Sequence, residues 1–266
     1  MKILNGKELA GFIKERQAGQ VRAAVSDGGR TPKLLIIRDS DNPVILKYVN
    51  LKIAYGEDIG VVVEDYKASS FEDIRARILA ANDDSEIDGV ILQLPILDKE
   101  KTDEVTSLIA PGKDVDGLSS KGDFDSATAT AILWLLVGYD IDLRGRKVAL
   151  VGRGKLVGAP LFKMLSNSGI DVEMFHSGSD LKRLSDFDVI ITATGKPSLI
   201  VSEYVAPGAV VVDAGTASED GVLKGDVSDA VREREDLLAI TPVVGGVGPL
   251  TITCLFDHVI QAAEKA

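Results

Sequence analysis

Residues 147–160 constrain the fold of this chain more than any other stretch. The apolar residues 148–151 are followed by Gly152, Gly154 and Gly158, and then by a helix-compatible segment. This order predicts a strand, a tight glycine turn and a helix whose first backbone amides could bind a pyrophosphate. The spacing G-x-G-x-x-x-G is one residue longer than the common dinucleotide-binding pattern. A glycine turn that serves only close packing of helix on strand therefore stays open as the alternative.

Short apolar segments alternate with helix-like segments on both sides of residue 120. The expected strands are residues 33–38, 60–64, 88–95, 148–151, 171–176, 186–194 and 208–215. The expected helices are residues 5–25, 44–58, 69–82, 102–109, 159–168 and 250–265. Such alternation is typical of parallel sheets with helical crossovers, so we predict an α/β protein of two domains joined within residues 121–129.

Composition excludes several classes of function. A net charge of −11 over 266 residues argues against general nucleic-acid binding, which needs a basic face. Cys254 is the one cysteine and there are two histidines, so we expect no disulfide, no metal site and a reducing compartment. No apolar run is long enough to span a membrane, and the N-terminal residues turn polar too soon for a signal peptide. We expect a cytoplasmic protein with no membrane partner.

Tyr48 and Lys52 lie four residues apart in the helix expected at residues 44–58, so they share one face of it. Apolar neighbours would lower the pKa of Lys52 toward a range useful for proton transfer. The alternative is a lysine that extends to solvent beside a core-filling tyrosine. Short-chain dehydrogenases also carry a Tyr-x-x-x-Lys pair, but it follows their glycine turn, whereas here the pair precedes it.

Polar residues also end the third expected strand and occupy the next loop. Gln93 is the polar side chain within residues 90–94, and in an open parallel sheet ligands bind beyond the carboxyl ends of the strands. Its amide could contact a ligand or could satisfy the backbone of the loop. Asp114 and Asp116 follow in residues 113–117, where charged side chains are commonly only solvated.

Seven motifs occur in one order, and the ordered set is far more specific than any single motif. They are Tyr48-x-x-x-Lys52, Asp88-Gly-Val-Ile-Leu-Gln-Leu-Pro95, Lys113-Asp-Val-Asp-Gly117, Gly152-Arg-x-x-x-Val-Gly-x-Pro160, Ala193-Thr-Gly-Lys-Pro197, Gly225-Asp-Val227 and Thr241-Pro-Val-Val-Gly-Gly-Val-Gly-Pro249. Over nearly the whole chain this set resembles the bifunctional methylenetetrahydrofolate dehydrogenase/methenyltetrahydrofolate cyclohydrolase family. The resemblance implies oxidation of 5,10-methylenetetrahydrofolate with a nicotinamide cofactor, followed by hydrolysis to 10-formyltetrahydrofolate.

The resemblance also implies the domain organisation. An N-terminal α/β catalytic domain would comprise residues 1–122, with the C-terminal helix 250–266 returning to it. A Rossmann-like domain of residues 123–249 would bind NADP or NAD. Folate would lie in the cleft between the domains of a homodimer.

Individual roles follow from the matching positions. The resemblance makes Lys52 the catalytic lysine, Tyr48 the aromatic group against the folate, and Gln93 the partner that holds and tunes Lys52. It makes Asp116 the carboxylate that binds the pterin, and Pro249 a further substrate contact. The residues it assigns to the cofactor are Gly152, Arg153, Gly154, Lys155, Val157, Gly158, His176, Ser177, Ala193, Thr194, Gly195, Gly215, Thr216 and Gly246.

The chain departs from the family pattern at five places. Ile45 and Gly154 stand where the family has serine, and Val244 stands where it has proline. Residues 126–131 replace the family's Pro-Cys-Thr-Pro-x-Gly, and residues 118–122 lack its His-Pro and asparagine. These changes leave two alternatives open. One is a lysine-base dehydrogenase for another small substrate such as shikimate, and the other is a folate- or nucleotide-binding protein without catalysis.

The choice of cofactor depends on the charges near the glycine turn. NAD-specific folds usually carry an acidic residue about twenty positions after the turn, at the end of the second strand. That strand ends here at His176, while Glu173 lies inside it and Asp180 comes later. Arg153 and Lys155 in the turn could bind a ribose 2′-phosphate, so we predict NADP, with NAD as the alternative.

Overall fold

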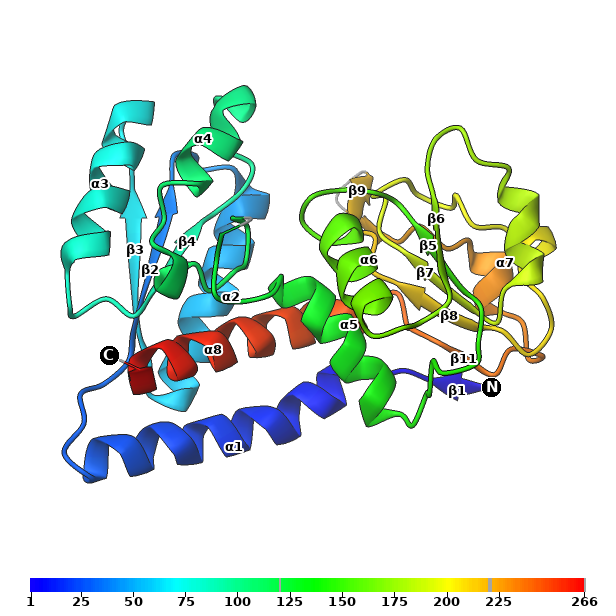
Figure 1. Ribbon diagram of the computed structural model, residues 1–266, viewed down its shortest axis with the longest axis horizontal. Helices are drawn as coiled ribbons and strands as arrows, with labels where there is room; N and C mark the ends of the chain where they lie inside the picture. Colours follow the sequence, from blue (N-terminus) through cyan, green and yellow to red (C-terminus); the bar gives the residue numbers. More distant parts are fainter. Residues whose placement is uncertain (120, 220–221, 266) are drawn as a thin grey trace. The chain divides into compact units, whose positions relative to one another are not determined.

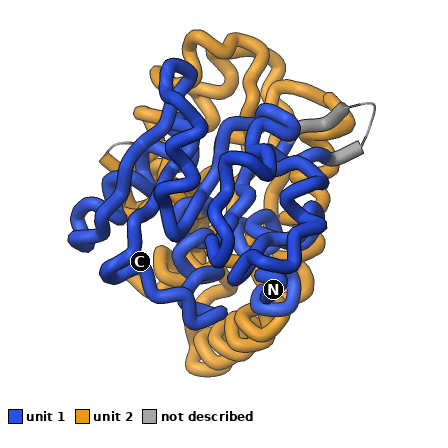
Figure 2. Tube along the Cα trace, turned by 90° about the vertical axis from the view of Figure 1, so that its right-hand side faces the viewer, with its two compact units in different colours: residues 1–10, 128–251 blue, residues 11–127, 252–266 orange. Residues whose placement is uncertain are grey.

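The computed structural model describes residues 1–119, 121–219 and 222–265 of the chain. It divides into unit 1, residues 1–10 and 128–251, and unit 2, residues 11–127 and 252–266 (Figure 2). Each unit contains a parallel sheet, as expected for an α/β protein of two domains. Among the described helices, none combines the length and the apolar character that crossing a membrane would require.

Unit 2 has a three-stranded parallel sheet in the order β3-β2-β4 (Figure 1). Its strands are β2 (Lys33–Arg38), β3 (Val62–Lys67) and β4 (Gly89–Leu92). Helices α2 (Pro43–Ile59) and α3 (Phe71–Asp83) form the crossovers, and α4 (Thr102–Thr106) follows β4. Most of α1 (Gly6–Ser26) and the later part of α8 (Val247–Lys265) complete the unit, together with the short 3₁₀ turns η1 (Lys99–Lys101) and η2 (Pro111–Lys113).

Successive side chains of β2 and β4 are buried on both faces of the sheet, as is usual for parallel strands covered by helices, whereas the edge strand β3 is partly exposed. On one face a core cluster joins β2 and β4 to α3 and α4, with Leu35, Ile37, Val90, Leu92, Ile74, Ile78 and Val105 as members. On the other face Gly56 of α2 lies against Val63 and Phe256, and Gly89 of β4 lies against Val259. Helices α2 and α8 therefore cover the second face of this sheet.

The C-terminal helix is tied into unit 2 by a buried polar network. The Gln17 amide of α1 donates to the Thr253 carbonyl at 2.9 Å, and the Tyr55 hydroxyl of α2 donates to the Gln17 amide oxygen at 2.7 Å. The predicted return of the last helix to the N-terminal domain is confirmed, since α8 packs there with α1 and α2.

Unit 1 contains a six-stranded parallel sheet in the order β1-β11-β8-β7-β5-β6. Its strands are β1 (Lys2–Ile3), β5 (Val148–Val151), β6 (Val172–Phe175), β7 (Val189–Thr192), β8 (Val210–Asp213) and β11 (Ala239–Ile240). The connecting elements are α5 (Ala127–Gly138), α6 (Gly158–Asn167), η3 (Leu181–Asp186), η4 (Ser202–Tyr204) and α7 (Asp229–Arg232). A two-stranded antiparallel ribbon, β9 (Ala217–Glu219) with β10 (Val222–Lys224), is an addition that the sequence pattern did not predict.

The strand order of unit 1 identifies its ligand-binding edge. β5 has β6 on one side and β7 on the other, so the direction of strand addition reverses at β5. In open α/β sheets, ligands bind at such a reversal, beyond the carboxyl ends of the strands. The glycine turn after β5 and the loop after β7 both lie there, as the predicted Rossmann-like arrangement requires.

The boundaries differ from the expected ones in a few places. Residues 1–10 group with unit 1, because β1 pairs with β11, whereas the sequence analysis placed them with the rest of residues 1–122. The second expected strand, residues 60–64, begins at Val62 because Gly60, with a φ of 82°, ends α2 in the left-handed conformation. The cap of α3 lies one residue later than expected, since the Ser70 hydroxyl accepts from the Asp73 amide.

Candidate active site

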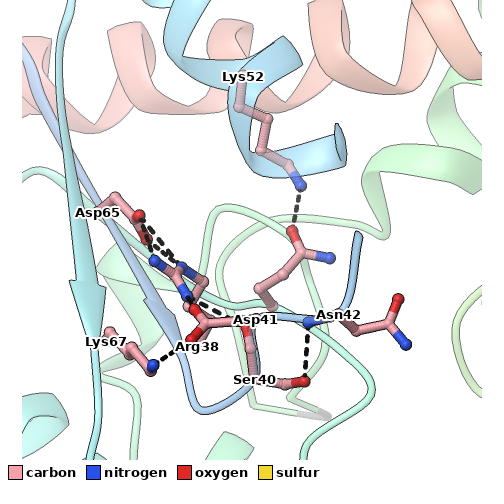
Figure 3. Close-up of polar contacts among 8 residues, drawn as sticks. Arg38, Ser40, Asp41, Asn42, Lys52, Asp65 and Lys67 are labelled. Atoms are coloured by element: carbon pink, nitrogen blue, oxygen red, sulfur yellow. Dashed lines mark hydrogen bonds and ion pairs between the residues drawn. The ribbon is translucent and has the colours of Figure 1, made fainter. Parts of the chain in front are cut away.

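Lys52 lies on α2, whose start is fixed by a charged cluster at the ends of β2 and β3 (Figure 3). Arg38 donates to Asp65 at 2.9 Å and to Asp41 at 2.6 Å, and Lys67 also pairs with Asp41. The Asn42 side chain then caps the helix by accepting from the Val44 amide at 2.9 Å. The cluster thus fixes the position from which α2 presents Lys52.

Lys52 forms a direct hydrogen bond to Gln93, which follows β4. The Lys52 Nζ donates to the Gln93 Oε1 at 2.7 Å (Figure 3), and the Gln93 Nε2 donates to the Leu94 carbonyl at 3.2 Å. Gln93 is only 9% exposed. The amide of Gln93 therefore satisfies a loop carbonyl, as the second interpretation from the sequence expected, and its oxygen accepts from Lys52. Contact of Gln93 with a ligand stays a prediction.

Burial shifts two titratable groups of this region toward their neutral forms. Burial lowers the pKa of Lys52, and the nearby Asp116 carboxylate opposes this shift. Burial likewise raises the pKa of Asp116, against the positive charges of Lys52 and His258. The predicted direction for Lys52 is confirmed. Opposed shifts of this kind are common where groups exchange protons at neutral pH.

The two aspartates of residues 113–117 have different surroundings. Asp114 is fully buried, and its carboxylate accepts from the amides of Leu118 at 3.2 Å and Ser119 at 2.7 Å. Within the part of the chain that the structure describes, the Asp116 carboxylate has no hydrogen-bond partner, and it is only partly buried. Asp114 is thus a structural residue, while Asp116 can accept hydrogen bonds from a ligand.

His258 is a neighbour of this loop that the sequence analysis did not single out. Its Nδ1 lies 2.8 Å from the Val115 carbonyl oxygen, so Nδ1 carries the proton and donates. Its ring stacks on Phe124 with centroids 4.8 Å apart, and burial lowers its pKa. The residue next to Asp116 is therefore held by α8. The sequence signal was the spacing of Cys254 and His258, one turn apart in an apolar helix.

Tyr48 lies one turn before Lys52 on α2 and is 37% exposed. A partly exposed ring beside a half-buried lysine offers an apolar face to a flat ligand. Ile45, where the family has serine, is buried and adds only apolar surface to this helix. The aromatic ring of Tyr48 and the amine of Lys52, which the sequence analysis paired, thus lie one turn apart on the same helix.

The glycine turn of unit 1 depends on two of its three glycines. Gly152 has a φ of 111°, and a Cβ there would lie 2.6 Å from the Ala193 carbonyl oxygen. A Cβ on Gly158 would collide with the backbone of Gly152, whereas a Cβ on Gly154 would meet nothing within 4 Å. Of the three glycines, Gly152 and Gly158 are sterically required and Gly154, which stands where the family has serine, is not. Val157, the N-cap of α6, makes no side-chain hydrogen bond to the helix.

The other residues expected to bind the cofactor gather at the carboxyl edge of the same sheet. They follow β6 (His176, Ser177), β7 (Ala193, Thr194, Gly195) and β8 (Gly215, Thr216), while Gly246 precedes α8. Arg153 and Lys155 are exposed in the glycine turn. Pro249 lies in the first turn of α8, in unit 1.

The acidic residues near the end of β6 already have protein partners. Both carboxylate oxygens of Glu173 accept from Arg183, at 2.7 and 2.9 Å. The Asp180 carboxylate caps η3 by accepting from the Lys182 amide at 3.1 Å. In the described ranges, no group of three or more His, Cys, Asp or Glu side chains could hold a metal ion.

Comparison with known proteins covers both parts of the chain. A family model described as "Tetrahydrofolate dehydrogenase/cyclohydrolase, catalytic domain" matches residues 4–116. The corresponding "NAD(P)-binding domain" model matches residues 126–266. The bifunctional protein FolD of Staphylococcus saprophyticus is 37% identical over 280 residues, which cover 99% of this chain and 97% of that protein.

Solved structures agree with these matches. The bifunctional enzyme FolD, a methylenetetrahydrofolate dehydrogenase/cyclohydrolase from Campylobacter jejuni, has a TM-score of 0.94 and 32% identity, covering 100% of this chain and 99% of its own. The Trypanosoma brucei methylenetetrahydrofolate dehydrogenase-cyclohydrolase, complexed with NADP cofactor and inhibitor, has a TM-score of 0.90 and 26% identity, covering 99% and 97%. The resemblance found in the motifs is confirmed, and the chain belongs to the tetrahydrofolate dehydrogenase/cyclohydrolase family.

Proposed function

We propose that this chain oxidises 5,10-methylenetetrahydrofolate with NADP and hydrolyses the 5,10-methenyl product to 10-formyltetrahydrofolate. The observation that carries the proposal is the Lys52–Gln93 hydrogen bond of 2.7 Å, beside an Asp116 carboxylate that has no hydrogen-bond partner among the described residues. Residues 1–122 with 250–266 would supply the folate side and residues 123–249 the cofactor side.

Lys52 is the proton-transfer group of the hydrolysis. Water adds to the methenyl carbon, one carbon–nitrogen bond breaks, and a proton is released. The neutral amine of Lys52, favoured by burial, accepts the proton of the attacking water. Its ammonium then returns that proton to the departing ring nitrogen. Gln93 accepts from the Lys52 amine and keeps it aimed at the substrate.

Asp116, Tyr48 and Pro249 bind the substrate. A pterin presents an amino group and a ring N–H side by side, which the two oxygens of the Asp116 carboxylate can accept. The exposed ring of Tyr48 packs against the flat folate. Pro249 in the first turn of α8 contributes a rigid apolar contact.

The residues of unit 1 fit a dinucleotide. The close approach of Gly152 to the Ala193 carbonyl brings the turn after β5 and the loop after β7 together at the reversal of strand order. Arg153 and Lys155 bind the 2′-phosphate, since Glu173 and Asp180 both have protein partners. NADP, when bound, supplies the hydride acceptor, and the chain holds the substrate in the geometry for transfer.

Two alternatives have less support. A shikimate-type dehydrogenase would pair its lysine with an acid, whereas the hydrogen bond of Lys52 is to the amide of Gln93 and the nearby Asp116 acts on Lys52 through its charge alone. A non-catalytic homologue would have no reason to keep Lys52 hydrogen-bonded to the buried Gln93. The proposal further includes a homodimer in the cytoplasm, which sedimentation of the purified protein and fractionation of its host would test.

A spectrophotometric assay tests the proposal directly. 5,10-Methylenetetrahydrofolate is supplied with NADP or NAD, and both the reduced nicotinamide and the methenyl absorbance are followed. Hydrolysis is measured separately from 5,10-methenyltetrahydrofolate. We expect both activities, with NADP preferred. Absence of both, in protein that binds folate, would favour the non-catalytic alternative.

A further inference from the structure

A pair of buried aspartates lies beneath the cofactor edge of unit 1 and has no role in the function described so far. Asp213 ends β8 and Asp226 lies between β10 and α7. Asp226 is 0% exposed and Asp213 8% exposed. Carboxylates are rarely buried to this extent without specific partners, because desolvation of the charge is costly.

Asp226 holds the loop that follows β7. Its Oδ2 accepts from the Thr192 hydroxyl and from the Thr194 amide, both at 2.6 Å. Its Oδ1 accepts from the Lys196 amide at 2.9 Å. All three donors belong to residues 192–196. This one carboxylate therefore fixes the backbone conformation of a segment that we expect to bind the cofactor.

Asp213 holds Asp226 and the loop that follows β8. Its carboxylate accepts from the amides of Gly215 at 3.0 Å, Asp226 at 3.1 Å and Val227 at 3.0 Å. Arg232 pairs with it, and also donates to the Thr241 carbonyl at 2.7 Å. The two aspartates thus connect the ends of β7, β8 and β11.

The glycines of this region show how tightly the pair is enclosed. A Cβ added to Gly215 would collide with the Asp226 carboxylate, and a Cβ added to Gly225 would collide with that of Asp213. The Gly225-Asp-Val227 motif therefore has a physical explanation. The glycine lets the backbone approach Asp213, and the aspartate receives the amides of the neighbouring loop.

We propose that Asp226, fixed by Asp213, is a positioning residue that sets the loops after β7 and β8 for cofactor binding without touching the cofactor. This inference rests on the proposed function, since it assigns residues 193–195 and 215–216 to the nicotinamide cofactor. The charge is essential because every donor around Asp226 is an N–H or O–H group. An asparagine in the same place must turn its amino group toward one of those donors.

The test compares Asp226→Asn with Asp229→Asn, a matched change at an exposed aspartate of the same unit. We expect Asp226→Asn to raise KM and Kd for NADP about tenfold or more, as for loss of a hydrogen bond to a charged group. Hydrolysis of 5,10-methenyltetrahydrofolate consumes water and no nicotinamide, so it should change far less. Asp229→Asn should leave all three values unchanged.

A purely structural role predicts a different result. It would lower the melting temperature of Asp226→Asn while leaving KM and Kd for the cofactor as they are, and that outcome overturns the inference. If Asp226→Asn does not fold, Thr192→Val removes one donor to Asp226 and should raise the KM for NADP by a smaller factor. An unchanged KM in Thr192→Val would then contradict the inference. Wild-type protein inactive with both nicotinamides would instead contradict the proposed function.

Discussion

The Lys52 region of unit 2 and the glycine turn of unit 1 are built in different ways. In unit 2 the groups that could react are partly buried side chains that lie near one another, and their pKa values are shifted toward the neutral forms. In unit 1 the ligand-binding edge is largely backbone, brought close by Gly152 and Gly158, and its charged side chains are exposed. The first region should therefore depend on the identity of its side chains, and the second on the absence of side chains at two positions.

The largest effect is expected at Lys52. Lys52→Met keeps the length of the side chain and removes the amine, so hydrolysis of 5,10-methenyltetrahydrofolate should fall by about 10²- to 10⁴-fold. Direct measurement of the methenyl absorbance checks this. Lys47→Met, at an exposed lysine of the same helix, is the control. Hydrolysis at the wild-type rate in Lys52→Met would remove the lysine from the mechanism.

The coupling of Gln93 to Lys52 gives the next largest effect. If Gln93 acts by holding the amine, its loss should matter little once the amine is gone. Gln93→Ala alone should slow hydrolysis by about 10- to 100-fold, an estimate for one charge-assisted hydrogen bond. The double variant should then resemble Lys52→Met. Logarithmic losses that simply add across the two sites would show that Gln93 acts independently.

The glycine turn should tolerate side chains at one position and not at another. Gly158→Ala places a Cβ against the backbone of Gly152, so the turn must shift and dehydrogenase kcat/KM should fall by about tenfold or more. Gly154→Ala meets open space and should leave the activity nearly unchanged. Steady-state kinetics with NADP distinguishes the two. Equal losses would mean that the turn adopts another conformation when the cofactor binds.

Much of this architecture follows from local patterns in the sequence. The helix carrying Tyr48 and Lys52 was predictable because a turn-rich segment ending at Pro43 precedes it and apolar residues recur along it, although Gly60, which ends it, was placed in the next strand. The strand before Gly152 was predictable because it is short, apolar and followed at once by glycine. Gln93 was also predictable, as a polar residue at the end of a buried strand.

Other features depend on contacts between distant residues, which local patterns do not contain. The pairing of β1 with β11 joins residues more than 200 positions apart, so the assignment of residues 1–10 was not predictable. Asp114 resembles a solvated loop residue until its burial under the loop amides is known. His258 lies near the loop that carries Asp116 only because α8 returns to unit 2. Asp226 lies among its hydrogen-bond donors only because the loops of unit 1 converge.

The charge of Asp116 should be visible in the pH dependence of hydrolysis. The Asp116 carboxylate raises the pKa of Lys52 against the effect of burial. Asp116→Asn removes that charge, so the pKa of Lys52 should fall further and the neutral amine should persist at lower pH. The rising limb of the kcat–pH profile should therefore move toward lower pH. A profile shifted toward higher pH, or not shifted, would show that Lys52 does not govern this limb.

The smallest effect is expected at the exposed charges of the glycine turn. Arg153→Ala should lower kcat/KM for NADP by about tenfold and leave that for NAD nearly unchanged, because only NADP carries the 2′-phosphate. Gly154→Ser should raise the preference for NADP by a few-fold, about the value of one neutral hydrogen bond, since the structure leaves open space for that side chain. Steady-state kinetics of both variants with NADP and with NAD checks these two expectations. If the parent enzyme prefers NAD and Arg153→Ala does not change its kinetics, the assignment of NADP as the cofactor is wrong. Asp180 would then have to leave its cap on η3 to bind the ribose of NAD.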